Sequence, residues 1–538
     1  MGRVCSRKQE NDRTMAIQFE PKIAELRLAY DRAKNDRPHR CFIEYPHLIK
    51  WTELDLSEWL ADLKDKCVSG FQPHSSRLCW LPKANSLLRP GNILHFKDEV
   101  IYNLLLGRLY ESIYKSLKSF QKEPDAAYVL AGERKAPWFQ SSFTSWKEFR
   151  TKSLEYLQDE TYFVVVADIT GFYENIDTDK LLSDLRQIVG GSKPEIDLLR
   201  VCLRKWSARG EKGIPQGYSA SDLLAKVYAN PIDIALKHDG YRHLRYVDDI
   251  RIFCRSRIEA KRAIFSLSQH IHKRGLNLQS AKTEILSSTD AFTKFDDVKP
   301  TVEGIQKELM AEIQKEISEE NPYPDSQYVE RLLRRYKELP SAVLERTFEE
   351  YFAASNPTPF NKTLFHYLLN RIGKAKSRVA VNYCLDALRE RAEETAYILK
   401  YFSEIGPLKA DIKSIVDYLI SPIAIYDYQC YQVIKWLFEE KLKEKRVIMY
   451  CRAIMKDLGR DLWLRSWGIA YLGRYGDIAD LTSIESMYAG CASDFEKADC
   501  VMALSELESG RRNSFYASVK GDGLLVDRAI KIAKGSKK

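Results

Sequence analysis

Three aspartates stand at positions where the strands of one sheet are expected to end. Asp248 and Asp249 lie directly before an apolar run at 250–253, and Asp168 ends an earlier apolar run at 163–167. A strand, a tight turn and a second strand place the paired acids at the tip of a hairpin, and the earlier strand presents Asp168 beside them. The sequence therefore predicts three carboxylates that converge in the folded chain.

Converging carboxylates are suited to holding divalent cations. Their oxygens suit Mg²⁺, which keeps several waters and completes its shell with substrate phosphates. Two such ions about 3.5–4 Å apart can activate an attacking 3′-hydroxyl and stabilise a departing pyrophosphate. We therefore predict nucleotidyl transfer with two Mg²⁺ ions, or with Mn²⁺ in their place. The predicted catalytic residues are Asp168, Asp248 and Asp249, and the predicted metal-binding positions are these three together with Ile169.

The residues after Asp168 carry the next part of the pattern, since paired aspartates alone are more often a simple turn. Gly171 permits a close turn off the strand, and Tyr173 follows two residues later. By itself Tyr173 reads equally as a buried core tyrosine. Asp177 and Asp179 precede a periodic apolar stretch, which favours a role at a helix N-terminus rather than as metal ligands.

A second motif lies between the two aspartate segments. Residues 213–219 read Gly-Ile-Pro-Gln-Gly-Tyr-Ser. Glycine and proline make a rigid loop whose backbone can approach a nucleotide closely. Ser219, Ser221 and Asp222 are candidate capping residues for the helix that follows. A plain structural turn is the alternative interpretation.

From about residue 80 to residue 290, these segments resemble the reverse transcriptase family in content and order. The resemblance implies an α+β fingers-palm fold of the right-hand polymerase type. It also implies that the ring of Tyr173 collides with a ribose 2′-hydroxyl and so selects deoxynucleotides, and that Gln216 packs against the nascent base pair. Lys83, Arg89 and Lys282 would contact phosphates, although Lys282 alone would be an ordinary surface lysine. The palm-motif positions are Gly213, Pro215, Gly217 and Tyr246.

Charge is distributed unevenly along the chain. The net charge is +9, and residues 1–290 hold 46 Lys and Arg against 38 Asp and Glu, whereas the remaining residues hold 38 against 37. The basic surplus thus lies in the half with the polymerase motifs, where it would attract phosphate backbones and make binding sensitive to salt. The expected partners are deoxynucleoside triphosphates and nucleic acid, either an RNA template or a noncoding RNA and a DNA product.

Length and cysteine content bound the remaining possibilities. A chain of 538 residues exceeds one ordinary domain. Its 11 cysteines form no Cys-x-x-Cys pair and no nearby Cys/His cluster, so we expect free thiols in a reducing cytosol rather than disulfides or a zinc site. No apolar stretch is long enough for a bilayer and no secretory signal is evident, so we expect a cytoplasmic protein without a membrane partner.

Helix periodicity replaces strand signals from about residue 325 onward. The pairs Trp436-Leu437, Tyr471-Leu472 and Ala503-Leu504 recur 32 to 35 residues apart, which indicates an α-solenoid of the HEAT or tetratricopeptide kind, with a plain helical bundle as the alternative. The predicted domains are an N-terminal helical extension at 1–75, fingers at 76–165, a palm at 166–290, connector or thumb-like helices at 291–370 and an all-α helical-repeat domain at 371–538.

A reverse transcriptase palm joined to a long helical tail resembles the bacterial abortive-infection (Abi-type) and other defence-associated reverse transcriptases. The usual Phe-Arg-Pro template segment is missing from residues 128–140, which puts ordinary template handling in doubt. The resemblance implies RNA-directed or template-independent DNA synthesis in bacterial antiphage defence, and possible homo-oligomers formed through the helical domain. Two alternatives stay open: an RNA-dependent RNA polymerase, and a non-catalytic RNA-binding scaffold with the same fold.

Overall fold

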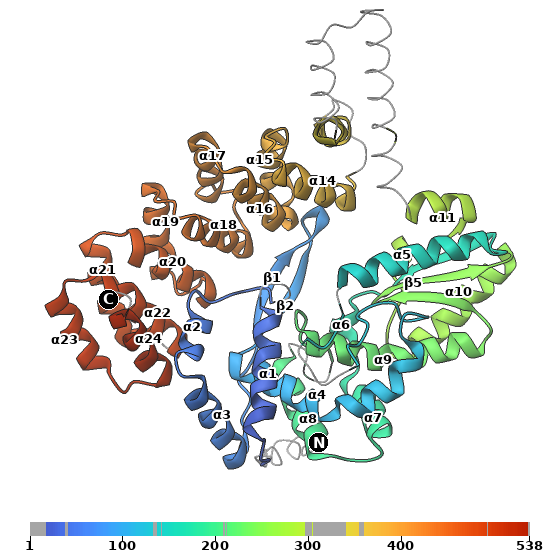
Figure 1. Ribbon diagram of the computed structural model, residues 1–538, viewed down its shortest axis with the longest axis horizontal. Helices are drawn as coiled ribbons and strands as arrows, with labels where there is room; N and C mark the ends of the chain where they lie inside the picture. The colour runs from blue at the N-terminus through green and yellow to red at the C-terminus, as the bar shows by residue number, and fades with distance from the viewer. Residues whose placement is uncertain are drawn as a thin grey trace, which may run out of the picture. The chain divides into compact units, whose positions relative to one another are not determined.

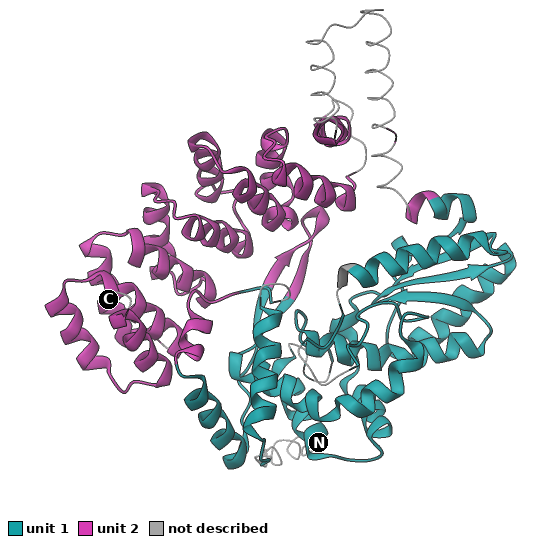
Figure 2. Ribbon diagram, viewed as in Figure 1, with its two compact units in different colours: residues 1–43, 55–79, 91–292 teal, residues 44–54, 80–90, 293–538 magenta. Residues whose placement is uncertain are grey.

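The computed structural model describes residues 18–37, 41–132, 137–140, 142–207, 210, 212–295, 304, 340–353, 360–491 and 493–535 (Figure 1). The chain divides into two compact units (Figure 2). Unit 1 comprises residues 1–43, 55–79 and 91–292, and unit 2 comprises residues 44–54, 80–90 and 293–538. The five predicted domain boundaries remain predictions. Within the described ranges, no helix combines the length and the apolar character needed to cross a membrane.

Unit 1 contains a four-stranded antiparallel sheet with the strand order β4-β5-β3-β6. The two central strands are buried because they are rich in β-branched and other apolar residues, such as Val164, Val165 and Ile252. α10 packs against β3 and β5, and α5 packs against β4 and β5. The strands are β3 (Phe163–Asp168), β4 (Arg242–Tyr246), β5 (Asp249–Cys254) and β6 (Glu284–Ser287).

The helical part of unit 1 is built around α4 (Phe96–Leu117). This helix of 22 residues is buried on most of its circumference, and α1, α7, α8 and α9 pack against it. The other helices of this unit are α1 (Ile23–Asp36), α3 (Leu56–Gly70), α5 (Ser142–Gln158), α6 (Phe172–Asn175), α7 (Thr178–Val189), α8 (Pro194–Trp206), α9 (Ser219–His238) and α10 (Arg257–Lys273), while α11 (Ser288–Phe295) spans the boundary to unit 2.

Two sequence-based predictions about helix starts can be judged here. Asp177 caps α7, because its side chain accepts the backbone N–H of Lys180 at 3.0 Å, as expected. The predicted caps of α9 are wrong, since Tyr218 is the N-cap and makes no side-chain capping bond. Ser219 instead donates its backbone N–H to Asp36 at 2.9 Å, so a tertiary partner has replaced the local one.

A β-hairpin of two strands, β1 (Arg77–Pro82) and β2 (Leu88–Ile93), links parts of both units. Its tip, residues 80–90, is grouped with unit 2. The tip contains the 3-10 turn η1 (Ala84–Ser86), which packs against η5 (Ala392–Glu394) of the same unit.

Unit 2 is helical apart from the hairpin tip in the part that the structure describes. Even-numbered helices pack in succession: α14 on α16, α16 on α18, α18 on α20, α20 on α22 and α22 on α24. Their bounds are α14 (Lys362–Lys374), α15 (Val381–Glu390), α16 (Thr395–Ile405), α17 (Lys409–Leu419), α18 (Asp427–Glu439), α19 (Lys445–Lys456), α20 (Leu462–Tyr475), α21 (Ile478–Met487), α22 (Asp494–Ala503), α23 (Ser509–Val519) and α24 (Leu524–Gly535). The prediction of a helical C-terminal region is confirmed, and its assignment to the HEAT class stays a prediction.

A segment from the N-terminal part of the chain is built into unit 2. This segment, residues 44–54, includes the short helix α2 (Leu48–Glu53), which packs against α24. The backbone N–H of Glu44 donates to the Tyr431 hydroxyl at 3.0 Å, and its carbonyl accepts from Trp467 Nε1 at 2.7 Å. Arg528, which is buried, donates to the carbonyl of Trp51 at 3.0 Å. Residues more than 380 positions apart therefore share one core.

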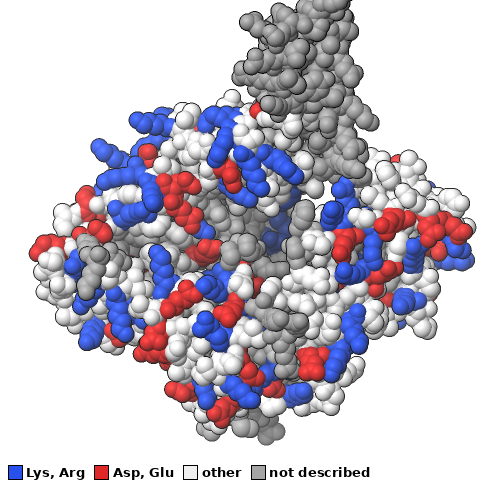
Figure 3. All heavy atoms as spheres, in the orientation of Figure 1, with Lys and Arg blue, Asp and Glu red and all other residues white. Residues whose placement is uncertain are grey.

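Charged side chains of both signs are interspersed on the face drawn in Figure 3. Lys and Arg alternate there with Asp and Glu over each unit. Most of the predicted connector at 291–370 lies outside the described residues, which resume at residue 340 with one helical segment before η4 (Glu349–Ala353).

Candidate active site

The three aspartates lie at one edge of the sheet in unit 1. β3 and β5 pair in antiparallel register with Asp168 opposite Asp249, and Tyr246 of β4 is opposite Asp249 on its other side. Asp248 stands in the two-residue turn between β4 and β5, and its carbonyl accepts the backbone N–H of Ile169 at 3.2 Å. The structure therefore brings together the residues that the sequence pattern singled out.

The turn itself has an unusual backbone. Val247 has a φ of 60°, in the left-handed region that a β-branched residue rarely adopts. A positive φ at the first turn residue is typical of a type II′ hairpin turn, where glycine is preferred. Such a conformation costs about 1–3 kcal/mol and persists only where the surroundings enforce it.

A buried arginine supplies that enforcement. Arg245 Nη1 donates to the carbonyl of Val247 at 3.1 Å, while its Nη2 lies 2.6 Å from Asp233 and 2.9 Å from Asp125. Lys226 Nζ also contacts Asp125, at 2.7 Å. All four charged side chains are buried, so each needs these partners. Burial raises the pKa of Asp233, but Arg245 and His243 outweigh this effect and hold it at about 2.

Sequence reasoning missed this network. Arg245 and Asp233 are 12 residues apart, on different elements, and Asp125 is more than 100 residues away. The available signal was a charged residue, Arg245, two residues before Val247 in a strand that leads into the aspartate turn. We interpret Arg245 as a positioning residue for that turn, because it acts through the Val247 backbone.

Negative charge accumulates at the aspartates. The pKa of Asp248 is raised to about 6, chiefly by burial and then by the charges of Asp249 and Asp168. Lys282 offsets part of this effect, since its Nζ lies 3.2 Å from Asp168 Oδ2. Three carboxylates gathered at one edge of the sheet favour an added cation.

The donor set is appropriate for that cation. Three carboxylates and a backbone carbonyl are oxygen ligands, which Mg²⁺ prefers. Among the described residues, the three aspartates are not a group whose ligand atoms all lie within 4.8 Å of one another. A shared ion would therefore require these side chains to move closer together. Asp168, Asp248 and Asp249 could hold the metal, whereas Ile169 could offer only its carbonyl.

Tyr173 lies in α6 directly after the turn at Gly171, which has a φ of 53°. Its hydroxyl donates to Asp222 Oδ1 of α9 at 2.5 Å, and its ring is half-buried. The hydrogen bond fixes the ring in one orientation. Tyr173 is therefore neither an ordinary core tyrosine nor a mobile surface ring, and it stands five residues after Asp168.

The glycine-proline loop packs against the segment that carries Tyr173. Gly213 donates its backbone N–H to Ile176 at 2.8 Å, and Ile214 donates to the carbonyl of Tyr173 at 3.0 Å. Gly213 has a φ of 87°, and a Cβ atom there would lie 3.0 Å from the Glu174 carbonyl oxygen. Only glycine fits this approach without strain.

Gln216 stands half-buried on this loop, between buried Pro215 and Gly217, whose φ is 99°. The backbone N–H of Gln216 faces Asn92 Oδ1 at 3.4 Å, and the Tyr218 hydroxyl donates to the Asn92 carbonyl at 3.1 Å. Two segments of unit 1 thus hold the loop rigid, and the Gln216 backbone is fixed within it.

The predicted phosphate-binding cations fall in different places. Lys282 lies in η3 (Ser280–Lys282) beside Asp168, as described above. Lys83 and Arg89 belong to the hairpin tip that is grouped with unit 2, so their place relative to the aspartates of unit 1 stays a prediction. Lys83 is exposed, and its backbone N–H closes the tip by donating to Leu87 at 2.8 Å.

Comparison with known proteins adds an independent finding. Residues 81–317 match the model of a family described as reverse transcriptase (RNA-dependent DNA polymerase). This segment contains the sheet, the aspartate turn and the glycine-proline loop. No curated protein matches the sequence.

Solved telomerase structures are among those similar to the chain. Apo telomerase from Candida tropicalis, truncated from its C-terminal domain, has a TM-score of 0.31 and 12% identity over 40% of this chain and 51% of that chain. Telomerase from Candida albicans in complex with the TWJ fragment of telomeric RNA has a TM-score of 0.32 and 13% identity over 76% of this chain and 68% of that chain. The chain thus spans about half the length of the former. At these TM-scores the likeness supports no conclusion about activity.

Proposed function

We propose that this chain, a nucleotidyltransferase with a reverse transcriptase domain at residues 81–317, extends a 3′-hydroxyl with deoxynucleotides by two-metal catalysis. One observation carries the proposal: Asp168 and Asp249 are directly opposite in adjacent strands, and Asp248 stands in the adjoining turn. Burial and mutual repulsion of these acids favour bound divalent cations, and Mg²⁺ fits their oxygen donors.

Each residue has a defined part in this proposal. Asp168, Asp248 and Asp249 hold two Mg²⁺ ions, which supply activation of the 3′-hydroxyl and stabilisation of the leaving pyrophosphate when bound. Lys282 sits beside Asp168 and can neutralise phosphate charge or protonate the departing pyrophosphate. Arg245 keeps the turn in the geometry that presents both acids.

The neighbouring motifs select and orient the nucleotide. In this proposal the ring of Tyr173, which a hydrogen bond to Asp222 anchors, collides with a ribose 2′-hydroxyl and so favours deoxynucleotides. Gln216 on its rigid loop contacts the nascent base pair. Lys83 and Arg89 on the hairpin tip contact the triphosphate once it is bound.

The test is DNA synthesis by the purified full-length chain. Wild-type protein is incubated with Mg²⁺ and deoxynucleoside triphosphates, with a primer on an RNA template and separately without nucleic acid. Asp248→Asn should abolish synthesis and leave the circular dichroism spectrum unchanged. Asp179→Asn is the matched control, because Asp179 is a half-exposed acid on α7 that pairs only at the surface with Arg200. Synthesis by the Asp248 variant at the wild-type rate would refute the proposal.

The same assay separates the two alternatives. An RNA-dependent RNA polymerase would incorporate ribonucleotides in preference to deoxynucleotides. A non-catalytic scaffold would bind RNA tightly with no difference in synthesis between wild type and Asp249→Asn. Product sequence decides the mode of synthesis, since a complementary copy requires a template and a random or homopolymeric product does not.

The biological setting that we propose is bacterial antiphage defence of the abortive-infection type, in the cytoplasm. Its support is the sequence resemblance together with a helical C-terminal region whose alternate helices pack in succession, as HEAT-like repeats do. Repeats of this kind present long surfaces for a partner or for a second copy of the chain. Plating of phages on bacteria that express wild type or Asp248→Asn tests the proposal, and equal plaque numbers on both strains would contradict it.

A further inference from the structure

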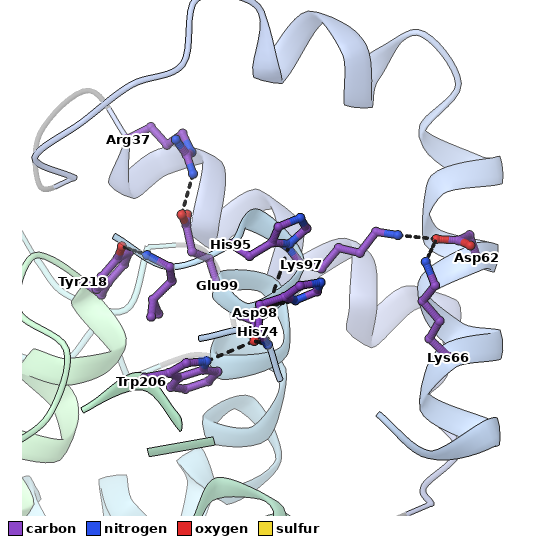
Figure 4. A network of polar contacts seen from close by, with 11 residues as sticks. Arg37, Asp62, Lys66, His74, His95, Lys97, Asp98, Glu99, Trp206 and Tyr218 are labelled. Carbon is purple, nitrogen blue, oxygen red and sulfur yellow. Dashed lines mark hydrogen bonds and ion pairs between the residues drawn. The ribbon is translucent and has the colours of Figure 1, made fainter. Parts of the chain in front are cut away.

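Two histidines and an aspartate meet in unit 1, at the start of α4 (Figure 4). His95 is the residue before α4, Asp98 lies in its first turn, and His74 lies in the segment between α3 and β1. One ligand atom of each lies within 4.8 Å of the other two. Because His74 is more than 20 residues from its partners, no sequence spacing reveals the group.

The separations are close to those of ligands on one metal ion. His74 Nδ1 lies 2.5 Å from Asp98 Oδ2, and His95 Nδ1 lies 3.8 Å from the same oxygen. The two imidazole rings are stacked with centroids 3.9 Å apart. Ligands bound tetrahedrally at about 2.0–2.1 Å are about 3.4 Å from one another. The two rings are nearly parallel, at 16°, so one imidazole must rotate before both Nδ1 atoms are directed at one ion.

The buried carboxylate of Asp98 is oriented by other donors. Its Oδ1 accepts Trp206 Nε1–H at 3.0 Å and the backbone N–H of His74 at 2.9 Å. These bonds leave Oδ2 directed at the two imidazoles, in the manner of outer-shell bonds that orient a metal ligand. Among the described residues, the two histidines are the only basic groups within ion-pair distance of Asp98. A buried carboxylate without Lys or Arg favours a cation.

The cations nearby already have acidic partners. Lys97 Nζ lies 2.6 Å from Asp62, and Arg37 lies 2.5 Å from Glu99 (Figure 4). Glu99 and Asp98 also lie in the first turn of α4, where their charges oppose the positive end of the helix dipole. Lys97 and Arg37 are therefore each paired with an acid other than Asp98.

The imidazole of His95 is in the protonation state that a ligand requires. Its Nδ1 accepts the backbone N–H of Lys97 at 3.2 Å, near the long limit of a hydrogen bond. This weak capping bond is the one that an ion would replace. On His74, the ring proton would move from Nδ1 to Nε2.

We propose that His74, His95 and Asp98 bind one divalent transition-metal ion of the Zn²⁺ class, distinct from the Mg²⁺ site at the aspartates. Two imidazoles and one carboxylate are ligands typical of Zn²⁺, whereas Mg²⁺ prefers an all-oxygen set. The side chain of His74 is 49% exposed, so water completes the coordination shell. The ion would clamp residues 71–76, which lead into β1, to the start of α4.

The test uses the full-length protein in excess Mg²⁺, so that the oxygen site is saturated. Titration with Co²⁺, followed by visible absorption and then by competition with Zn²⁺, should give one equivalent bound. His74→Ala and His95→Ala should each weaken binding at least about tenfold. His272→Ala is the matched control, because His272 is an exposed histidine on α10 of the same unit. It should bind as wild type does.

A second variant tests the hydrogen bond from Trp206 that orients the Asp98 carboxylate. Trp206→Phe keeps a ring in the core and removes the N–H that orients Asp98, so affinity should fall about 10- to 100-fold with the stoichiometry unchanged. Zn²⁺ should also raise the melting temperature of wild type and not that of His74→Ala. His74 is half exposed, which makes misfolding of that variant a poor explanation. Absence of bound Co²⁺ in wild type, or equal affinity in His74→Ala, would overturn the proposal.

Discussion

The sheet of unit 1 and the helices of unit 2 differ in how their sequence relates to chemistry. In the sheet, few side chains matter and each has a fixed place: Asp168 and Asp249 face each other in register, with Asp248 one residue away. In unit 2, long stretches of buried apolar residues form a row of packed helices, and many positions contribute similarly to the stability of this core. Single substitutions at these acids of the sheet should therefore abolish function, whereas single substitutions in the core of the unit 2 helices should reduce stability.

The largest effect is expected at the aspartates, and it has opposite signs for activity and stability. Asp168→Asn should lower synthesis about a thousandfold, an effect of about 4 kcal/mol on the transition state. In the presence of EDTA the same change should raise the free energy of unfolding, because it removes one of three like charges. Urea unfolding with and without Mg²⁺ measures the second effect. A loss of stability in EDTA would contradict the repulsion described above.

Removal of the Arg245 guanidinium, which holds the aspartate turn, should lower both DNA synthesis and stability. Arg245→Met leaves Asp233 buried without its main cation and removes one of the two cations beside Asp125, which costs about 3–5 kcal/mol. Synthesis per folded molecule should also fall, since Val247 loses its hydrogen bond. Urea denaturation and synthesis assays on soluble protein give the two numbers. Arg255→Met is the control, because Arg255 is 75% exposed and pairs only with Glu160. Equal stability of the two variants would remove Arg245 from this role.

A core substitution in unit 2 offers the contrasting case. Leu437 is fully buried in α18, and Leu437→Ala should lower the free energy of unfolding by about 2–5 kcal/mol. Synthesis per folded molecule at low temperature should stay near that of wild type. Leu458→Ala, at a position that is 80% exposed, is the control for both measurements. A hundredfold loss of synthesis in folded Leu437→Ala would show that the two units do not divide their tasks in this way.

Substitution of Tyr173 should have a smaller effect, limited to the discrimination between deoxynucleotides and ribonucleotides. Tyr173→Ala should reduce discrimination against ribonucleotides about 10- to 200-fold, because the steric barrier is lost. Tyr173→Phe keeps the ring and loses only the bond to Asp222, so discrimination should persist. Paired incorporation rates for one deoxynucleotide and its ribonucleotide measure the ratio. Unchanged discrimination in the alanine variant would assign the selection to another residue.

The smallest effect is expected at the turn residue itself. Val247→Gly relieves a strained φ that costs about 1–3 kcal/mol, but it adds chain entropy worth about 0.5–1 kcal/mol to the unfolded state. The free energy of unfolding should therefore stay the same or rise by up to about 2 kcal/mol. Destabilisation in urea unfolding would mean that the Val247 side chain contributes packing that the backbone conformation does not account for.

The local sequence pattern was enough to predict the aspartate turn, but it could not predict the buried ion pairs that hold this turn in place. Asp248 and Asp249 are adjacent, and Gly171 and Tyr173 follow Asp168 within five residues. Each group is therefore a short motif that is visible in the sequence. Arg245, Asp233 and Asp125 come together only through tertiary packing of a helix, a strand and a loop. The same holds for the proposed capping of α9, where Asp36 took the place of a local side chain.

Histidine spacing could not reveal the group at the start of α4, for a related reason. The absence of a nearby Cys/His cluster in the sequence argued against a zinc site. His74 reaches Asp98 only because the segment before β1 folds back over the first turn of α4. In the helical C-terminal region, the periodicity of apolar residues predicted helices correctly. Periodicity cannot determine which helix packs against which.

Residues 44–54, near the start of the chain, belong to the core of unit 2, and this affects how the protein folds during synthesis. Residues 44–54 leave the ribosome early, yet the carbonyl of Trp51 receives its hydrogen bond from Arg528, 477 residues later. At about 5–20 residues per second, that interval is about 20 to 100 seconds. During this time the early segment has no core to join, so its apolar side chains must be shielded by a chaperone or by transient contacts. Shortening the gene from its 3′ end would leave the same surface uncovered permanently.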